Sequence, residues 1–418
     1  MKTENETLNP EQTDALDLLN SGENVFLSGG AGSGKSYVVR RFQDVASKKS
    51  FPVLASTGAA AVLIGGRTFH SYFGLGIMEG GVTQTVERAL KQKNLKRRLS
   101  EAEGIIIDEV SMIPASALEA AEEIARLSRE SSLPWGGLRV IAVGDFFQLP
   151  PVVNQFGQSA ARPWCFKSPT WEKTGFMSKI LCHNHRVSDD TFLDVLSEVR
   201  QGRVSSKVRS YLNGQMLENQ FDDDAIRLFP RRNQASEFNV HQLSKIDREP
   251  VNIDTIFIGE DRFIETFKKN CPIPERLTLK TGCRVMFLQN DPQKRWVNGT
   301  VGEVVSVSQT EVQVKKLRGR EVKVDKTMFS YLNADGEIVA SAINFPLTLA
   351  YATTIHKAQG ATLDQLWTDL RGLWEPGHAY VAISRLREGT GLRLLSWSDR
   401  SFIVDPEVIQ FYQLLGHS

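Results

Sequence analysis

The sequence predicts an α/β protein with two parallel-sheet units and a smaller β-rich insertion. Three observations support this fold class. Short apolar runs alternate with helical periodicity between residues 10 and 170. The same alternation resumes near Trp171 and continues towards the end of the chain. Inside this second part, residues 283–344 alternate apolar and polar side chains with period two, as short antiparallel strands do.

Length and composition agree with two or three globular domains. The chain has 418 residues, of which 41% are hydrophobic and 24% are charged, and this length exceeds what one core usually holds. The formal net charge is +1, so a nucleic-acid site would need a local groove and not a generally basic surface. No apolar run reaches the roughly 18–20 residues of a membrane span, and the polar residues 1–6 do not resemble a signal peptide. The four cysteines lack C-x-x-C spacing, which favours free thiols.

Each unit is justified by its own strand candidates. The first unit is predicted over residues 1–170, with strands at Val25–Ser28, Pro52–Ser56, Gly104–Asp108 and Leu138–Gly144. Residues 74–99, Gly-rich and then basic, interrupt the alternation and predict a small insertion. The second unit is predicted over 171–282 and 345–418, with strands at Lys179–Cys182, Ile226–Phe229, Leu347–Ala350, Gln365–Asp369 and Leu392–Leu395. The turn signals Asn298-Gly299 and Asp335-Gly336 and about five short strands predict a small β-barrel over residues 283–344.

The first loop of the first unit predicts a nucleotide site. Residues 29–36, GGAGSGKS, fit the pattern G-x-x-x-x-G-K-[ST] between a strand and a helical pattern. Backbone N–H groups of such a loop surround phosphates at a helix N-terminus. Lys35 would contact the β- and γ-phosphates, and the Ser36 hydroxyl would ligate Mg²⁺. The nucleotide-binding residues expected here are Gly29, Gly32, Ser33, Gly34, Lys35 and Ser36.

Acidic residues follow the next apolar strand. Ile105–Ile107 predicts a buried strand that ends in Asp108 and Glu109. Asp108 suits the shell of a metal ion, and Glu109 can orient and deprotonate an attacking water. Together with the phosphate loop, this pair predicts binding and hydrolysis of a nucleoside triphosphate, with ATP and Mg²⁺ as the expected ligands.

Hydrolysis also needs groups that sense the γ-phosphate and stabilise transition-state charge. Gln148 follows an apolar strand, so it would lie at the carboxyl edge of the sheet, where open α/β folds bind ligands. Arg186 and Arg385 are the cationic candidates. The ordinary alternative for a single arginine is a surface ion pair, and the flanking sequences shift the balance towards a catalytic role.

Those flanking sequences form an ordered series that resembles a known family. The matching segments are Leu8–Gln12, Gly29–Ser36, Ser56–Ala61, Gly65–Gly74, Ile107–Met112, Gly144–Val152, Asn184–Arg186 with Phe192–Gly202, Thr353–Asp364 and Tyr380–Arg387. The chain resembles the superfamily-one DNA helicases of group B, and most closely the petite-integration-frequency (Pif-type) family. Val187 and Ala358 depart from the family's more usual Gln and Ser. The related RecD-like and Dda-like helicases share most of these motifs and stay open as alternatives.

The resemblance implies an ATP-dependent helicase that moves 5′ to 3′ on single-stranded DNA. It implies two RecA-like domains, a strand-separating wedge at residues 74–99 and an SH3-like β-barrel at 283–344. It assigns Gln12 to adenine, Gln359 and Gly360 to the nucleotide, and Gln148, Arg186, Gln359 and Arg385 to γ-phosphate coupling. The residues in its DNA-contacting motifs are Thr57, Gly58, His70, Thr354, His356 and Lys357. Phe73 and Trp296 are further candidates because aromatic rings stack on bases, with core packing as the alternative.

The remaining expectations concern partners and location. The resemblance implies single-stranded and forked or partial-duplex DNA as substrates, a monomer, no membrane, and work with replication or repair proteins or in recombination. A location in the cytoplasm of a bacterial or phage-infected cell, with the nucleoid, is expected. A single-stranded-DNA-stimulated ATPase that remodels nucleoprotein without unwinding remains an alternative. A phosphate-loop kinase or switch is disfavoured, because it needs no second RecA-like half.

Overall fold

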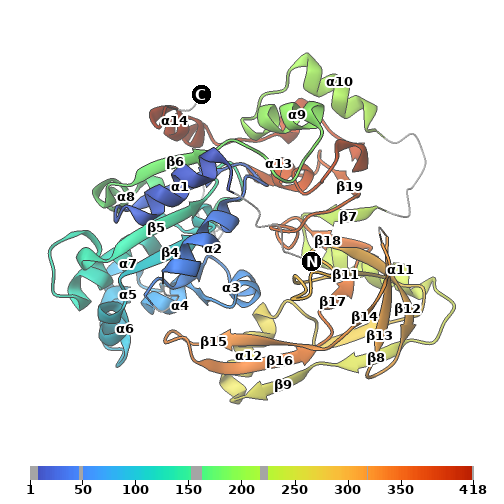
Figure 1. The fold of residues 1–418 in the computed structure, drawn as a ribbon, viewed down its shortest axis with the longest axis horizontal. Helices are drawn as coiled ribbons and strands as arrows, with labels where there is room; N and C mark the ends of the chain where they lie inside the picture. Colours follow the sequence, from blue (N-terminus) through green and yellow to red (C-terminus); the bar gives the residue numbers. More distant parts are fainter. Residues whose placement is uncertain (1–7, 47–49, 152–161, 217–224, 318, 417–418) are drawn as a thin grey trace.

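The computed structural model describes residues 8–46, 50–151, 162–216, 225–317 and 319–416. The N-terminal residues 1–6 and Val152, used above, lie outside this part of the chain. The model confirms the α/β class, with two parallel sheets and a separate antiparallel region (Figure 1). Among the described residues, no helix is both long enough and apolar enough to cross a bilayer.

The first domain is built on a six-stranded parallel sheet in the order β3-β2-β4-β5-β1-β6. Its strands are β1 Val25–Gly29, β2 Val53–Ala55, β3 Arg67–Thr68, β4 Gly104–Asp108, β5 Arg139–Gly144 and β6 Met177–Leu181. Its helices are α1 Pro10–Asn20, α2 Lys35–Val45, α3 Gly58–Ile64, α4 Phe69–Phe73, α5 Gly81–Leu90, α6 Leu95–Glu101, α7 Ala115–Ser128 and α8 Pro169–Thr174.

The alternation of side chains along β1 explains why helices cover both faces of this sheet. Val25 and Leu27 pack in the core formed with α1 and α2, whereas Phe26 points into the core formed with α4 to α8. All five residues of β1 are buried. A strand that is buried on both faces needs apolar residues throughout, which is the pattern seen in the sequence.

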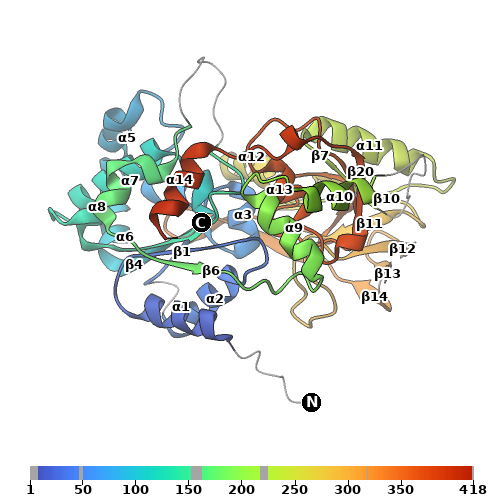
Figure 2. The same cartoon turned by 90° about the horizontal axis from the view of Figure 1, so that it is seen from above.

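The C-terminal helix α14, Pro406–Leu414, returns to the first domain (Figure 2). Val408 and Tyr412 belong to the same core as Phe26. The Phe411 ring stacks on that of Phe166 with centroids 4.4 Å apart. The last helix therefore completes the core of the domain that begins the chain, although the C-terminal segment was predicted to belong to the second unit.

The second domain has a four-stranded parallel sheet in the order β18-β7-β19-β20. Its strands are β7 Ile226–Phe229, β18 Ala352–Thr354, β19 Leu366–Asp369 and β20 Leu392–Ser396. Its helices are α9 Asp190–Arg200, α10 Ser206–Gly214, α11 Arg232–Ser244 and α13 His378–Ile383. Short 3₁₀ turns occur in both domains, at Val110–Met112, Pro134–Gly137 and Cys165–Lys167 in the first and at Gly389–Gly391 and Asp399–Ser401 in the second.

Two predicted strands of this domain were assigned to the wrong sheet. The Lys179–Cys182 candidate corresponds to β6, which pairs in parallel with β1 and closes the first sheet. The Leu347–Ala350 candidate corresponds to β17, Leu347–Leu349, which pairs antiparallel with β11 in the β-rich region. Both segments are strands as predicted, but the partner of a strand depends on long-range pairing that its own residues do not encode.

The β-rich region extends beyond the predicted residues 283–344 and contains three sheets. The largest has five antiparallel strands, β14-β13-β12-β11-β17, with β11 Arg284–Phe287, β12 Val301–Val307, β13 Val312–Lys316 and β14 Glu321–Val324. The others contain β15 Thr327–Leu332, β16 Ile338–Asn344 and β9 Ile256–Gly259, and β8 Val251–Asp254 with β10 Arg276–Leu279, and α12 Asp261–Asn270 lies beside β9 and β16. The SH3-like topology stays a prediction.

The β15–β16 hairpin contacts the first domain. Its Asp335 accepts hydrogen bonds from Arg98 Nη1 at 2.6 Å and from Asn94 Nδ2 at 2.9 Å. Arg67 donates to the carbonyl of Ala334 at 2.5 Å. The predicted insertion at residues 74–99 therefore consists of α5 and the first part of α6, held between α7 and the β-rich region. Its role as a strand-separating wedge stays a prediction.

Candidate ATP site and DNA-binding surface

The phosphate loop connects β1 to α2, and its backbone carbonyls accept hydrogen bonds from Lys35 at the start of α2. Lys35 Nζ donates to the carbonyls of Gly29 at 2.7 Å and Gly30 at 3.1 Å. Burial lowers the pKa of Lys35, and the nearby Asp145 opposes that shift. Gly34 has a φ of +88°, and a Cβ there would lie 2.5 Å from the Gln12 amide nitrogen. The positive φ favours glycine at this position, and a Cβ there would also push the Gln12 side chain out of place.

The acidic pair lies at the carboxyl end of β4, as predicted. The backbone N–H of Glu109 donates to Asp108 Oδ1 at 3.0 Å. Glu109 adopts a left-handed conformation with φ 51° and ψ 50°, which is uncommon for a residue with a Cβ and is often found at functional sites. Its Oε2 atom is buried with no partner. Burial and the neighbouring Asp108 raise the pKa of Glu109 to about 7, which suits a general base at neutral pH.

The two predicted arginines meet between the domains. Arg186 Nη1 donates to the carbonyl of Ser384 at 2.8 Å, and Arg385 donates to the carbonyl of Val381 and the hydroxyl of Ser384, both at 2.8 Å. Arg385 is 2% exposed. Burial and the charge of Arg186 lower the pKa of Arg385 to about 9, and burial also lowers the pKa of Arg186. Among the described residues, no carboxylate forms an ion pair with either arginine.

Three glutamines were also predicted to serve the nucleotide. Gln12 is 3% exposed, and its side chain lies 3.0 Å from the His185 ring. The Gln148 amide donates to Asp145 Oδ2 at 3.3 Å. Gln359 lies in the turn after β18, next to Gly360 with φ +79°, and its Nε2 atom is buried without a partner. Gln12 lies next to Gly34 of the phosphate loop. Gln148 is hydrogen-bonded to Asp145, whose charge acts on Lys35 of the same loop.

The chemistry of these atoms fits a nucleoside triphosphate with Mg²⁺. The buried polar atoms without partners include Ser33 Oγ, Glu109 Oε2 and Gln359 Nε2. Two unpaired guanidinium groups add positive charge that an anionic ligand would neutralise. The oxygen atoms of Ser36 and Asp108 are the donor type that Mg²⁺ prefers.

The predicted DNA contacts differ in their accessibility. Thr57 and Thr354 are structural caps, because their hydroxyls accept the N–H groups of Ala60 at 3.3 Å and Lys357 at 3.2 Å. His356 and Lys357 are exposed after β18. His70 is partly buried, and burial lowers its pKa. The Gly58 backbone lies against the side chain of Asn270 from α12, since a Cβ on Gly58 would meet it at 2.5 Å.

The aromatic candidates are corrected by the structure. Phe73 is 0% exposed within the core of the first domain. Trp296 is 6% exposed, stacks on Phe287 at 4.4 Å and is covered by the Arg295 guanidinium at 4.5 Å. Neither ring offers a free face to a base. Trp296 was a candidate because its ring could stack on a base, but the ring forms part of the small hydrophobic core of the β-rich region.

Several residues at these sites carried no role in the sequence analysis. Arg200 and Tyr380 lie inside matched motifs, and both are directed towards the phosphate loop. Tyr412 on α14 had no motif signal. Trp374, which is 43% exposed, follows β19, and the Arg231 guanidinium lies 5.2 Å from its ring. The signal that could have found Trp374 is its place after a strand of the second sheet, on the same edge as His356.

Comparisons with known proteins agree with this geometry. A family model described as PIF1-like helicase matches residues 7–210. The chain is 59% identical over 406 residues to a Bdellovibrio bacteriovorus protein named ATP-dependent DNA helicase Pif1, covering 97% of this chain and 92% of that protein. The fold is similar to that of Bacteroides sp. Pif1 in complex with ADP-AlF4, with a TM-score of 0.87, 29% identity and 98% and 97% of the two chains covered. Bacteroides Pif1 bound to single-stranded DNA gives a TM-score of 0.67, with the same 29% identity and the same 98% and 97% coverage. The relative and the two solved structures match both α/β domains and the β-rich region, and the chain belongs to the PIF1-like helicase family.

Proposed function

We propose that this protein is an ATP-dependent DNA helicase that moves 5′ to 3′ on single-stranded DNA and unwinds duplex ahead of it. The observation that carries the proposal is the pair of guanidinium groups beside Glu109 that form no ion pairs among the described residues, Arg385 fully buried and Arg186 partly buried. Unpaired cations in a low-dielectric cleft are costly. Their cost is offset when a triphosphate places its γ-phosphate between the domains, so nucleotide binding and domain closure depend on each other.

The residues of the cleft have distinct roles in this mechanism. The loop N–H groups and Lys35 bind the β- and γ-phosphates, and Glu109 accepts the proton of the attacking water. Mg²⁺, held by Ser36 and Asp108, would neutralise charge on the phosphate oxygens. Arg186 and Arg385 stabilise the charge that builds on the transferred phosphoryl group, a role in which an arginine contributes about 10³- to 10⁵-fold in kcat.

The DNA path is proposed along the carboxyl ends of the strands of both sheets. In the second sheet, Arg231 and Arg232 follow β7, His356 and Lys357 follow β18, and Trp374 follows β19. The pKa of Lys357 is lowered, first by partial burial of its amine and then by the charge of Arg232. The two cations therefore lie close together. Among the described residues, Arg231, Arg232 and Lys357 form no ion pairs. Cations beside an exposed ring suit a flexible single strand, which offers phosphates and unstacked bases.

The same edge of the first sheet carries Thr57 and Gly58 after β2. The backbone N–H groups at Thr57 and Gly58 suit sequence-independent contacts with DNA phosphates. This arrangement supports a strand that crosses both domains and is held alternately as the cleft opens and closes. The solved single-stranded DNA complex of the Bacteroides relative supports the same substrate class.

The test is unwinding of labelled duplexes that carry a single-stranded tail at either the 5′ or the 3′ end. The expected result is strand separation only from the 5′ tail, and only with ATP and Mg²⁺. Unwinding from the 3′ tail would contradict the direction. ATP hydrolysis stimulated by single-stranded DNA without any strand separation would favour nucleoprotein remodelling instead. Binding to single-stranded DNA would place the protein with the nucleoid. There it would act as a monomer beside replication or repair proteins.

A further inference from the structure

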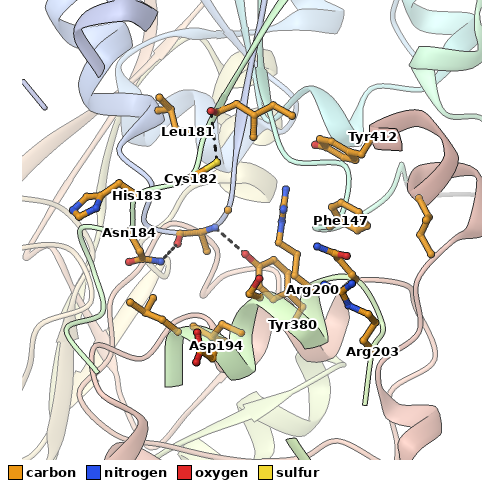
Figure 3. Close-up of a pocket in the computed structure, with 18 of the residues that line it drawn as sticks. Phe147, Leu181, Cys182, His183, Asn184, Asp194, Arg200, Arg203, Tyr380 and Tyr412 are labelled. Carbon is orange, nitrogen blue, oxygen red and sulfur yellow. Dashed lines mark hydrogen bonds between the residues drawn. The ribbon is translucent and has the colours of Figure 1, made fainter. Parts of the chain in front are cut away.

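A cavity of about 690 Å³ lies beside the phosphate loop between the two domains (Figure 3). The loop contributes Gly30 and Ala31 to its wall. The remaining wall residues used here are Phe147 after β5, Arg200 at the end of α9, Tyr380 on α13 and Tyr412 on α14. The cavity thus brings together elements of both domains and the C-terminal helix.

A largely buried ion pair, with the Arg200 side chain 17% exposed, crosses this region from one domain to the other. Arg200 donates to both oxygens of Asp145, with Nη2 2.8 Å from Oδ1 and Nε 3.1 Å from Oδ2. Asp145 is 0% exposed. The pair lowers the pKa of Asp145 and raises that of Arg200, in each case against the effect of burial. The Arg200 guanidinium also lies 4.6 Å from the Phe147 ring and 5.4 Å from the Tyr412 ring.

The Asp145 carboxylate that Arg200 holds also orients Gln148. The Gln148 side-chain amide donates to Asp145 Oδ2 at 3.3 Å, and its backbone N–H donates to the Asp145 carbonyl at 2.9 Å. The Phe147 N–H donates to Asp145 Oδ1 at 3.2 Å. The turn that carries the expected γ-phosphate sensor is therefore built around one carboxylate.

A second contact joins the domains close by. Tyr380 accepts a hydrogen bond from the backbone N–H of Ala31 in the phosphate loop, at 2.9 Å. Tyr380 is 5% exposed and lies on α13, directly before the segment that carries Arg385. The phosphate loop and the turn at Gln148 are thus each tied to the second domain by a specific polar contact.

We propose that Arg200 is a positioning residue for ATP hydrolysis, acting on Gln148 through Asp145. Arg200 belongs to the second domain and Asp145 to the first, so their bidentate contact forms only when the domains are in register. Gln148 is then held in its working orientation only in that arrangement, which makes hydrolysis dependent on domain position. This inference rests on the ATPase part of the proposed function.

The test combines substitutions that avoid an unpaired buried charge. The double variant Asp145→Asn with Arg200→Gln removes both charges and keeps similar side-chain sizes. Its single-stranded-DNA-stimulated kcat is expected to fall on the order of 10- to 100-fold, with little change in KM for ATP. Adding the double variant to Gln148→Ala should produce no further loss, because the pair acts through Gln148. Arg200→Lys should recover only part of the rate, since it keeps the charge and loses the bidentate geometry.

A matched control is available on the surface of the second domain. Arg209 makes a comparable bidentate contact to Asp399, with both side chains about half exposed. The double variant Asp399→Asn with Arg209→Gln should leave kcat unchanged. Thermal unfolding of all variants reports whether the folded state persists. A normal kcat in the Asp145–Arg200 double variant, or losses that multiply with Gln148→Ala, would overturn the inference. An inactive wild-type protein would overturn the proposed ATPase and this inference with it.

Discussion

Two sets of arginines lie in the same interdomain region and differ in whether a carboxylate pairs with them. Arg186 and Arg385 lack any ion pair in the part of the chain that the structure describes, and the pKa of Arg385 is lowered to about 9. Arg200 binds both oxygens of Asp145, and its pKa is raised. The side chain is the same, so we attribute the raised pKa of Arg200 and the lowered pKa values of Arg186 and Arg385 to the presence or absence of a carboxylate partner. An arginine without a carboxylate partner can pair with an anionic ligand, whereas Arg200, paired with Asp145, stabilises the contact between the domains.

The sign of the pKa shift gives the energetic consequence. The pKa of Arg385 falls from an ordinary 12.5 to about 9, so the folded protein disfavours its charged form. That cost is fully present below pH 9 and disappears only above 12.5. A bound triphosphate offsets it. We therefore expect substitutions in both sets to lower activity but to have opposite effects on stability.

The largest effect is expected for Arg385→Ala. It should lower kcat for ATP by about 10³-fold or more, while thermal stability without nucleotide stays equal or rises, because an uncompensated charge is removed. Arg186→Ala should behave in the same way. Steady-state ATPase assays and thermal unfolding check this. Weaker nucleotide binding with an unchanged kcat would place these arginines outside the catalytic cleft.

Glu109→Gln should slow hydrolysis about 10²- to 10⁴-fold while nucleotide binding persists. Burial of the carboxyl raises its pKa from 4.5 to about 7, so in the wild-type protein without nucleotide and metal, stability falls as the pH rises through this window. Glu109→Gln should therefore be more stable than the wild type at pH 8, on the order of 3 kcal/mol. The difference should vanish below pH 4.5 in denaturant titrations. A variant that is equally stable or less stable at pH 8 would show that Glu109 has a partner in solution.

Arg200→Ala should show the opposite balance. Removing one member of a buried pair leaves Asp145 charged and alone, which costs about 3–5 kcal/mol of unfolding free energy. The midpoint of urea unfolding should fall accordingly. A loss of activity without a loss of stability would mean that the pair is not a structural contact, and the contrast with Arg385 would disappear.

The smallest effect concerns two neighbouring cations in the β-rich region. Arg295 is paired with Asp291 at 2.8 Å, whereas Lys294 is exposed and forms no ion pair among the described residues. If the region holds single-stranded DNA, Lys294→Gln should make the slope of log affinity against log salt shallower by about 0.7. Arg295→Gln should leave the slope unchanged. Titrations of a labelled oligonucleotide at several salt concentrations check this, and equal slopes for the wild type and Lys294→Gln would show that Lys294 does not contact DNA.

Sequence patterns predicted the local features well. The loop at Gly29–Ser36 and the strand that ends in Asp108 were found because each depends on short spacings with a direct chemical meaning. The convergence of Arg186 with Arg385, which are far apart in the chain, was expected only from the family resemblance of the motifs around them. The structure differs where long-range packing decides. β6 joins the first sheet, β17 joins the β-rich region, and Trp296 is buried rather than exposed. No local pattern states which sheet will pair with a strand or which face of a ring will be covered. Arg200 escaped notice because its partner lies 55 positions away.

The return of α14 to the first domain affects how the chain folds while it is being translated. The sheet of that domain is complete once Leu181 has been translated, but its core still lacks Phe411 and Tyr412. At roughly 5–20 residues per second, the ribosome needs about 10 to 50 s to add the intervening chain. During that interval, Phe26 and Phe146 lack their final cover, so the nascent domain exposes apolar surface. Chaperone contact during translation would be directed to this uncovered face, and removing α14 would leave the same surface exposed in the finished protein.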